Sequence, residues 1–335
     1  MREWRPDIQQ AKGLAILLVV FGHLVARQDP AGVHWYEPLR RAIYAFHMPF
    51  FLYLSGVVAV YSGFLHRRRA EFRTMAAARA RRLLVPFLAM GVLVVLGKCA
   101  AARLVYVDNV PSSLGAGLLA LVWNTGQSPA LSIWYLFVLF VVGLATLWLL
   151  DGRAARLPWL LAASLVLFWV KLPAYLYVDR VTLFAPFFLL GAAAGFAGAR
   201  WEEWMQRHWH RAMLLFGAAL VAVALAPARA GWEQRTILLL AGSLSFPAIH
   251  GFLRDLRFPA LQSALALLGR YSFMIYLFNT LFIGLAKGIL LLRWNWNGVN
   301  FLPFATMLMS AGLMGPVALK HFGFRHVKRL DRLTN

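Results

Sequence analysis

The chain is poor in cysteine and in acidic residues. Its single cysteine, Cys99, excludes an internal disulfide and argues against a zinc site built on thiolates. Only 13 acidic residues accompany 34 lysines and arginines, so the formal net charge is +21. No carboxylate falls within the apolar runs described next, whereas a proton-coupled pump usually keeps one inside the membrane. The shortage of acidic residues in these runs therefore disfavours a pump.

Long apolar runs are abundant. Hydrophobic residues make up 61% of the chain, against about 45–50% in soluble domains. Runs of about 20 residues, enough to cross a hydrocarbon layer, recur from end to end. We expect residues 1–335 to form a single membrane-embedded domain, because no polar linker interrupts the runs. We predict an all-α membrane protein with about ten transmembrane helices, near 13–27, 42–62, 83–102, 132–150, 157–171, 181–199, 210–226, 235–253, 271–292 and 300–320.

The basic residues gather in short loops between alternate runs. If the N-terminus is cytoplasmic, about 23 of the 34 cations lie on the inner side, and the positive-inside rule then places both termini in the cytoplasm. Topology therefore accounts for the strong positive charge. We expect membrane lipid as a partner, and no nucleic acid.

Lys12 and His23 form a polar stripe on the first predicted helix. Eleven residues at 100° each come to about three turns, so both side chains share one face, roughly 16 Å apart along the axis. Polar groups inside a span are costly and usually functional. Imidazole suits proton transfer near neutral pH, so His23 is a candidate general base and Lys12 an anion contact at the inner mouth. The alternative is a snorkelling lysine and a histidine bonded to a nearby carbonyl.

Three further basic residues are candidates for the same site. His47 precedes Pro49 by two residues, and it could hold substrate or fix the tautomer of His23. It could equally be a packing histidine bonded to carbonyls that the proline frees. Arg79 and Arg82, three residues apart beside an apolar run, are candidate phosphate contacts. Topology and anionic lipid offer the other explanation for these arginines.

The remaining candidates are substrate contacts. Trp134 and Tyr135 begin a span, Asn279 is a polar insertion in another, and Glu37 and Arg180 lie at the expected outer face. These residues could bind a hydrophilic acceptor. Taken singly, such aromatics are typical of an interface belt, such an asparagine of a helix–helix hydrogen bond, and such charges of solvated loops.

Six motifs follow one another along nearly the whole chain: Lys12–His23, His47-Met-Pro-Phe-Phe to Ser55-Gly56, Arg79-x-x-Arg82, Trp134-Tyr-Leu, Phe187-Phe-Leu-Leu-Gly191 and Gly269-Arg-Tyr-Ser to Tyr276-Leu. Together they resemble the acyltransferase 3 family of integral membrane proteins. This family includes bacterial O-acetyltransferases that act on exopolysaccharide, lipopolysaccharide and other surface glycans. Two positions depart from the family pattern: Gln9 replaces a common aspartate, and Asn279 replaces a histidine, so no titrating role passes to it.

The resemblance implies a mechanism in a bacterial inner membrane. Acetyl-CoA would be the acyl donor, bound from the cytoplasm with its phosphates near Arg79, Arg82 and Lys12, and no metal would take part. The acceptor would be a sugar hydroxyl of an exopolysaccharide, lipopolysaccharide or lipid-linked oligosaccharide, whose proton His23 takes. No oligomeric state follows. A transporter or flippase of lipid-linked sugars is the main alternative. Two features of the sequence argue against it: it has no convincing internal repeat, and its predicted spans contain no carboxylate. An inactive relative that senses or scaffolds is a second.

Overall fold

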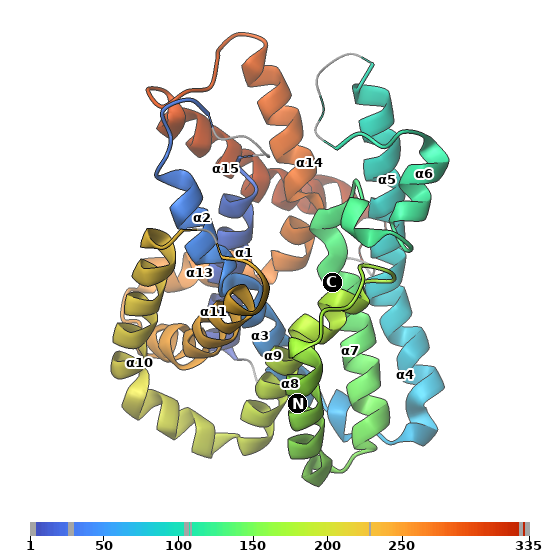
Figure 1. The fold of residues 1–335 in the computed structure, drawn as a ribbon, viewed down its shortest axis with the longest axis vertical. Coiled ribbons are helices and arrows are strands. Elements are labelled where there is room, and N and C mark those ends of the chain that lie inside the picture. Colours follow the sequence, from blue (N-terminus) through green and yellow to red (C-terminus); the bar gives the residue numbers. More distant parts are fainter. Residues whose placement is uncertain are drawn as a thin grey trace.

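The computed structural model describes residues 5–25, 30–103, 107, 109–227, 229–327 and 331, and they are almost entirely helical (Figure 1). Within these ranges the extended pairing is limited to two isolated bridges, Ala31–Asn297 and Asn124–Tyr175. The α-helices are α1 Pro6–Gly22, α2 Tyr36–Tyr44, α3 His47–Tyr61, α4 Phe72–Arg79, α5 Val85–Ala101, α6 Leu114–Ala120, α7 Trp134–Leu150, α8 Leu157–Trp169, α9 Val178–Ala197, α10 Ala199–Leu225, α11 Gly231–Ser245, α12 Gly251–Asp255, α13 Pro259–Arg270, α14 Ser272–Leu291 and α15 Phe301–Ala318.

The all-α membrane class is confirmed. In the described ranges, 8 helical stretches are long and apolar enough to cross a membrane, and each overlaps a predicted span. The other two predicted spans, 13–27 and 157–171, fall on α1 and α8, which have 17 and 13 residues. The count of ten and the position of the termini stay predictions. The eight stretches are Tyr36–Tyr61, Arg69–Ala101, Leu131–Leu150, Val178–Ala197, Ala199–Leu225, Gly231–Asp255, Ser272–Leu291 and Phe301–His326.

The basic segment before the third predicted span is helical rather than a loop. One helical stretch runs from Arg69 to Ala101, through α4, a π-helical turn at Ala80–Leu84, and α5. Alanine, arginine, methionine and leucine dominate this segment, and all four have high helix propensity. Sequence reasoning read the arginines as loop residues because they are charged, but charge does not interrupt a helix.

Each π-helical turn in the described structure lies within three residues of a proline. The turn at Ala80–Leu84 precedes Pro86, the turn at Phe246–His250 contains Pro247, and the turn at Leu319–Gly323 follows Pro316. A proline removes one backbone donor, so a wider turn offers the neighbouring carbonyls other partners. These prolines therefore reshape the helices without ending them.

Two pairs of helices cross so closely that only glycine fits. A Cβ atom at Gly56 on α3 would lie 2.0 Å from the carbonyl oxygen of Phe188 on α9, and one at Gly191 would lie 2.0 Å from that of Tyr53. These two glycines therefore set the distance between α3 and α9. A Cβ at Gly13 on α1 would likewise lie 1.9 Å from the carbonyl oxygen of Leu265 on α13. Small residues allow such approaches between membrane helices.

Helix α13 was not expected from the sequence, which suggested an inner loop over residues 254–270. It packs along the first half of α1, and Gly269 marks a second crossing, where a Cβ would lie 1.8 Å from the carbonyl oxygen of Gln9. This contact helps to enclose α1, the helix that leads into the predicted general base His23.

Candidate active site

Helix α1, dark blue in Figure 1, lies inside the bundle. It contacts α2, α3, α12, α13, α14 and α15, and from Asp7 to Val25 no side chain is exposed. The helix is buried in this way because its apolar residues lie on every side of it rather than in one stripe. Lys12 and His23 are only partly accessible and are surrounded by protein. Both therefore face the interior of the bundle rather than lipid.

His23 and His47 meet at the end of α1 distant from Arg5. His23 directly follows the helix, and it lies close enough to His47 for the two imidazoles to interact electrostatically. His47 is 7% exposed, and its Nδ1–H donates to the carbonyl oxygen of Ile43 at 2.9 Å. This bond leaves Nε2 of a neutral His47 as an acceptor. The carbonyl bond matches the packing alternative for His47, while its position beside His23 matches the site.

An exposed tyrosine borders the two imidazoles. Tyr44 is 41% exposed, its ring centroid lies 4.9 Å from that of His47, and its hydroxyl donates to the carbonyl oxygen of Gly22 at 2.9 Å. Arg40 interacts electrostatically with His23 and forms an ion pair with Glu37. The predicted acceptor contact Glu37 thus belongs to this group, and Tyr44 connects it to the molecular surface.

The predicted cations on the other half of α1 differ from one another. Lys12 interacts electrostatically with Arg82, which is exposed. Arg79 instead lies 3.7 Å from the centre of the Phe64 ring, and a Cβ at Gly143 would be 2.5 Å from its Nη1. Arg79 is therefore packed against α7, whereas Lys12 and Arg82 lie close enough for their like charges to repel each other.

The predicted contacts on α7 join α3, α9 and α14. The hydroxyl of Tyr135 lies 2.6 Å from that of Ser55, and its backbone N–H donates to the hydroxyl of Tyr276 at 3.2 Å. The Arg180 guanidinium lies 4.8 Å from the centre of the Trp134 ring. These residues hold four helices in register, so Trp134 and Tyr135 are not merely belt residues at the membrane interface.

Asn279 does not make the helix–helix hydrogen bond that its position suggests. Its Nδ2 donates to the carbonyl oxygens of Ile275 and Tyr276, both on its own helix, at 2.8 and 2.9 Å. Its Oδ1 is buried and has no hydrogen-bond partner within the described ranges. A buried acceptor without a partner is costly, so this oxygen has the capacity to accept one more hydrogen bond.

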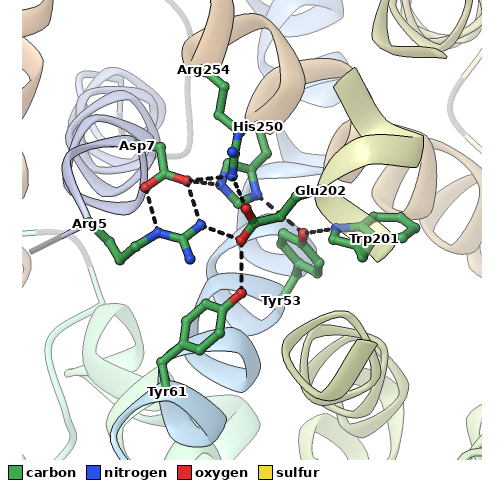
Figure 2. A network of polar contacts seen from close by, with 8 residues as sticks. All are labelled: Arg5, Asp7, Tyr53, Tyr61, Trp201, Glu202, His250 and Arg254. Atoms are coloured by element: carbon green, nitrogen blue, oxygen red, sulfur yellow. Dashed lines mark hydrogen bonds and ion pairs between the residues drawn. The ribbon is translucent and has the colours of Figure 1, made fainter. Parts of the chain in front are cut away.

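Sequence reasoning missed a polar network at the start of α1, shown in Figure 2. Asp7 bonds Arg5, His250 and Arg254 at 2.9, 3.2 and 3.3 Å, and Glu202 binds both arginines. His250 lies inside the predicted span 235–253. A single histidine in an apolar run was the one sequence feature that pointed to this network. Asp7 is 243 residues away from it, and no local spacing could pair them.

The network continues from His250 into α3. Trp201 Nε1–H donates to the hydroxyl of Tyr53 at 2.9 Å, and that hydroxyl lies 3.2 Å from His250 Nδ1. Every polar group in this series of hydrogen bonds has a partner when His250 Nε2 carries the proton and donates it to Asp7. These hydrogen bonds hold the first turn of α1 against α3, α10 and α12. They thereby also fix how far Lys12 and His23 lie inside the bundle.

Arg5 and Asp7 precede the apolar part of α1 and perturb each other. Burial raises the pKa of the Asp7 carboxyl, but bonds from His250 and Arg5 outweigh burial and hold that pKa well below its usual range. The hydrogen bond to Asp7 raises the pKa of Arg5 above its ordinary value. The carboxylate of Asp7 is therefore ionised at neutral pH and stabilises the folded chain.

We expect Asp7→Asn to lower the free energy of unfolding by roughly 2 kcal/mol, because it removes one of the two carboxylates that bind Arg5 and Arg254, while Glu202 still binds both. Thermal unfolding of the protein in detergent measures this. Asp255→Asn is the matched control, since Asp255 pairs only at 3.9 Å with an Arg257 side chain that is 89% exposed, and such surface pairs contribute little. Equal unfolding temperatures for the two variants would rule out a structural role for the network.

The structure thus sorts the predicted residues into three groups. His23, His47 and Glu37 lie around one end of α1, and Lys12 with Arg82 lies along its first half. The third group, around Tyr135 and Tyr276, includes Trp134, Arg180 and Arg79. Within the described ranges, no cluster of three or more His, Cys, Asp or Glu side chains could hold a metal ion.

Comparison with known proteins identifies the class. The profile of a family described as an acyltransferase domain matches residues 5–321. The chain therefore belongs to the acyltransferase 3 family, as the motifs suggested, and its fold is that of a multi-pass membrane protein. No solved structure matches the chain.

Two relatives share the name nodulation protein NolL. The protein from Sinorhizobium fredii (strain NBRC 101917 / NGR234) is 30% identical over 213 residues, which cover 63% of this chain and 54% of the relative. The protein from Mesorhizobium japonicum (strain LMG 29417 / CECT 9101 / MAFF 303099) is 39% identical over 80 residues, 23% of this chain and 20% of the relative. The chain thus matches about half of the first relative's length, and less of the second.

Proposed function

We propose that this protein is a bacterial inner-membrane O-acyltransferase, formed by residues 1–335 as one domain. It moves an acetyl group from cytoplasmic acetyl-CoA to a sugar hydroxyl of a surface glycan or a lipid-linked oligosaccharide. The family membership supports the reaction class. The structural observation that carries the proposal is the enclosure of α1, which keeps Lys12 and, directly after the helix, His23 inside the bundle.

The donor enters from the side that carries Arg82. Lys12 and Arg82 contact its phosphates, because two neighbouring cations favour a phosphorylated ligand. The pantetheine arm then extends along α1 toward His23. Arg79 takes a lesser part than the sequence suggested, since its guanidinium is packed on Phe64.

His23 acts on the acceptor as general base. It takes the proton of the sugar hydroxyl while that oxygen attacks the thioester carbonyl carbon. The new C–O bond forms, the C–S bond breaks, and the coenzyme A thiolate receives the proton from His23. His47, held by Ile43, faces the same space, and Tyr44 borders its outer opening. The unpartnered Oδ1 of Asn279 accepts from another hydroxyl of the acceptor.

The reaction can be tested with purified protein in lipid nanodiscs. Given acetyl-CoA and a soluble sugar acceptor, the wild-type protein should release free coenzyme A thiol and acetylate the sugar, which mass spectrometry detects. Mass spectrometry of surface polysaccharide from wild-type and deletion cells names the natural acceptor. Transport of a lipid-linked sugar across the bilayer without any acyl transfer would contradict the proposal and favour a flippase.

We expect Arg82→Gln to raise KM for acetyl-CoA roughly tenfold with little change in kcat, because it removes a charged contact made equally before and during the reaction. Arg81→Gln is the matched control, since Arg81 is the exposed neighbour in the same π-helical turn. Steady-state kinetics with varied acetyl-CoA measure both. Equal KM values for the two variants would remove Arg82 from the donor site.

A further inference from the structure

A second basic cavity lies where α13 meets α14 and α15 ends, and its lining contains neither Lys12 nor His23. It has a volume of about 240 Å³. Its lining contains three cations, Arg270, Lys320 and Arg325, and one carboxylate, Asp331. The formal charge of these four groups is +2, which is the charge that would neutralise one phosphate monoester. The full lining is Arg270, Tyr271, Met274, Lys320, His321, Arg325 and Asp331.

The carboxylate of Asp331 already pairs with the buried cation of this cavity, Lys320. Lys320 is 8% exposed, and its ammonium group lies 2.8 Å from Asp331 Oδ1 and 3.1 Å from the backbone carbonyl oxygen of Asp331. Burying a lysine requires an anionic partner. Asp331, which lies 11 residues further along the chain, supplies that anion from within the protein.

The two arginines leave the cavity short of negative charge. Arg270 and Arg325 are both exposed, and neither has a carboxylate within salt-bridge distance in the part of the chain that the structure describes. Arginine binds phosphate oxygens in a bidentate manner. The arrangement of one buried lysine and two open arginines therefore suits a dianion better than a carboxylate.

We propose that this cavity is a phosphate-binding site, in which Arg270, Lys320 and Arg325 bind a phosphate group and Asp331 competes with it for Lys320. Arg325 and Asp331 lie beyond residue 321, where the family match ends. The phosphate belongs either to the nucleotide end of the acyl donor, which rests on the proposed function, or to an anionic lipid headgroup.

Two variants with opposite expected effects test the site. The probe is 3′-phosphoadenosine 5′-phosphate, which carries nucleotide phosphates and no thioester, titrated onto full-length protein in phosphatidylcholine nanodiscs. Arg270→Gln with Arg325→Gln should weaken binding roughly tenfold or more, because charged contacts are lost. Asp331→Asn should strengthen it about threefold or more, because the competing anion is gone. Arg207→Gln with Arg257→Gln, two exposed arginines outside the cavity, is the matched control and should bind as wild type.

A second measurement separates the two sources of phosphate. Native mass spectrometry counts phosphatidylglycerol molecules retained by each protein. If the double variant loses the nucleotide, the donor is the source, whereas loss of phosphatidylglycerol alone identifies a lipid site. Unchanged binding of both probes overturns the proposal, and so do shifts of the same sign in Asp331→Asn and the double variant. Because the nucleotide cannot react, protein that binds it but transfers no acetyl group refutes the proposed function and leaves the cavity's role standing.

Discussion

His23→Ala should lower kcat for acetyl transfer by 100-fold or more while the protein still folds and still binds acetyl-CoA. A positioned general base contributes roughly 10²- to 10⁴-fold to a rate, and water in its place lacks both the basicity and the orientation. Folding should persist because His23 follows α1 rather than lying within it, and no described hydrogen bond of its side chain joins another element. The measurement is the initial rate of thiol release at saturating acetyl-CoA and acceptor.

A matched control separates loss of the base from general damage. His34 is exposed, and His34→Ala should retain the wild-type rate. His23→Gln should be as inactive as His23→Ala, because glutamine keeps polarity without a basic nitrogen. A His23→Gln protein with a wild-type rate would end the assignment of His23 as base and direct attention to His47.

Gly191→Val should prevent the protein from folding to a monodisperse form. Its Cβ would lie 2.0 Å from the carbonyl oxygen of Tyr53, which belongs to the backbone and cannot rotate away. Helices α3 and α9 would have to separate, and overpacking of this kind costs about 3 kcal/mol. Size-exclusion chromatography in detergent and thermal unfolding measure the loss.

Gly217→Val is the control for this prediction. Gly217 lies in α10, where a Cβ would meet no atom within 4 Å, so the same side chain should be tolerated there. A monodisperse Gly191→Val protein with the wild-type unfolding temperature would show that the α3–α9 crossing is looser than described.

The predictable features came from local patterns. Apolar runs located all 8 long apolar stretches because the bilayer fixes the length of a span. The spacing of Lys12 and His23 predicts one shared face because the pitch of a helix is constant. This stays a prediction, since α1 ends at Gly22 and His23 follows it. The polar insertion at Asn279 was noticed for the same reason, since a polar group stands out in an apolar run.

The features that were missed depend on contacts distant in sequence. Asp7 and His250 are far apart along the chain, and neither has a local pattern that names its partner. Helix α13 is short and partly polar, so only its crossing with α1 at Gly13 and Gly269 explains why it is ordered beside that helix. Arg79 was grouped with Arg82 because of their spacing, although its guanidinium packs on the ring of Phe64.

Thiol labelling from the two sides of the membrane tests most directly whether Lys12 and His23 face one water-filled passage. Since Cys99 is the chain's one cysteine, a Cys99→Ser background allows Lys12→Cys and His23→Cys to be probed singly with membrane-impermeant maleimides. We expect labelling at position 12 from the inner side, at position 23 from the outer side, and protection at position 12 by coenzyme A. Labelling of neither position by an impermeant reagent, with labelling by a lipid-soluble one, would contradict a passage along α1.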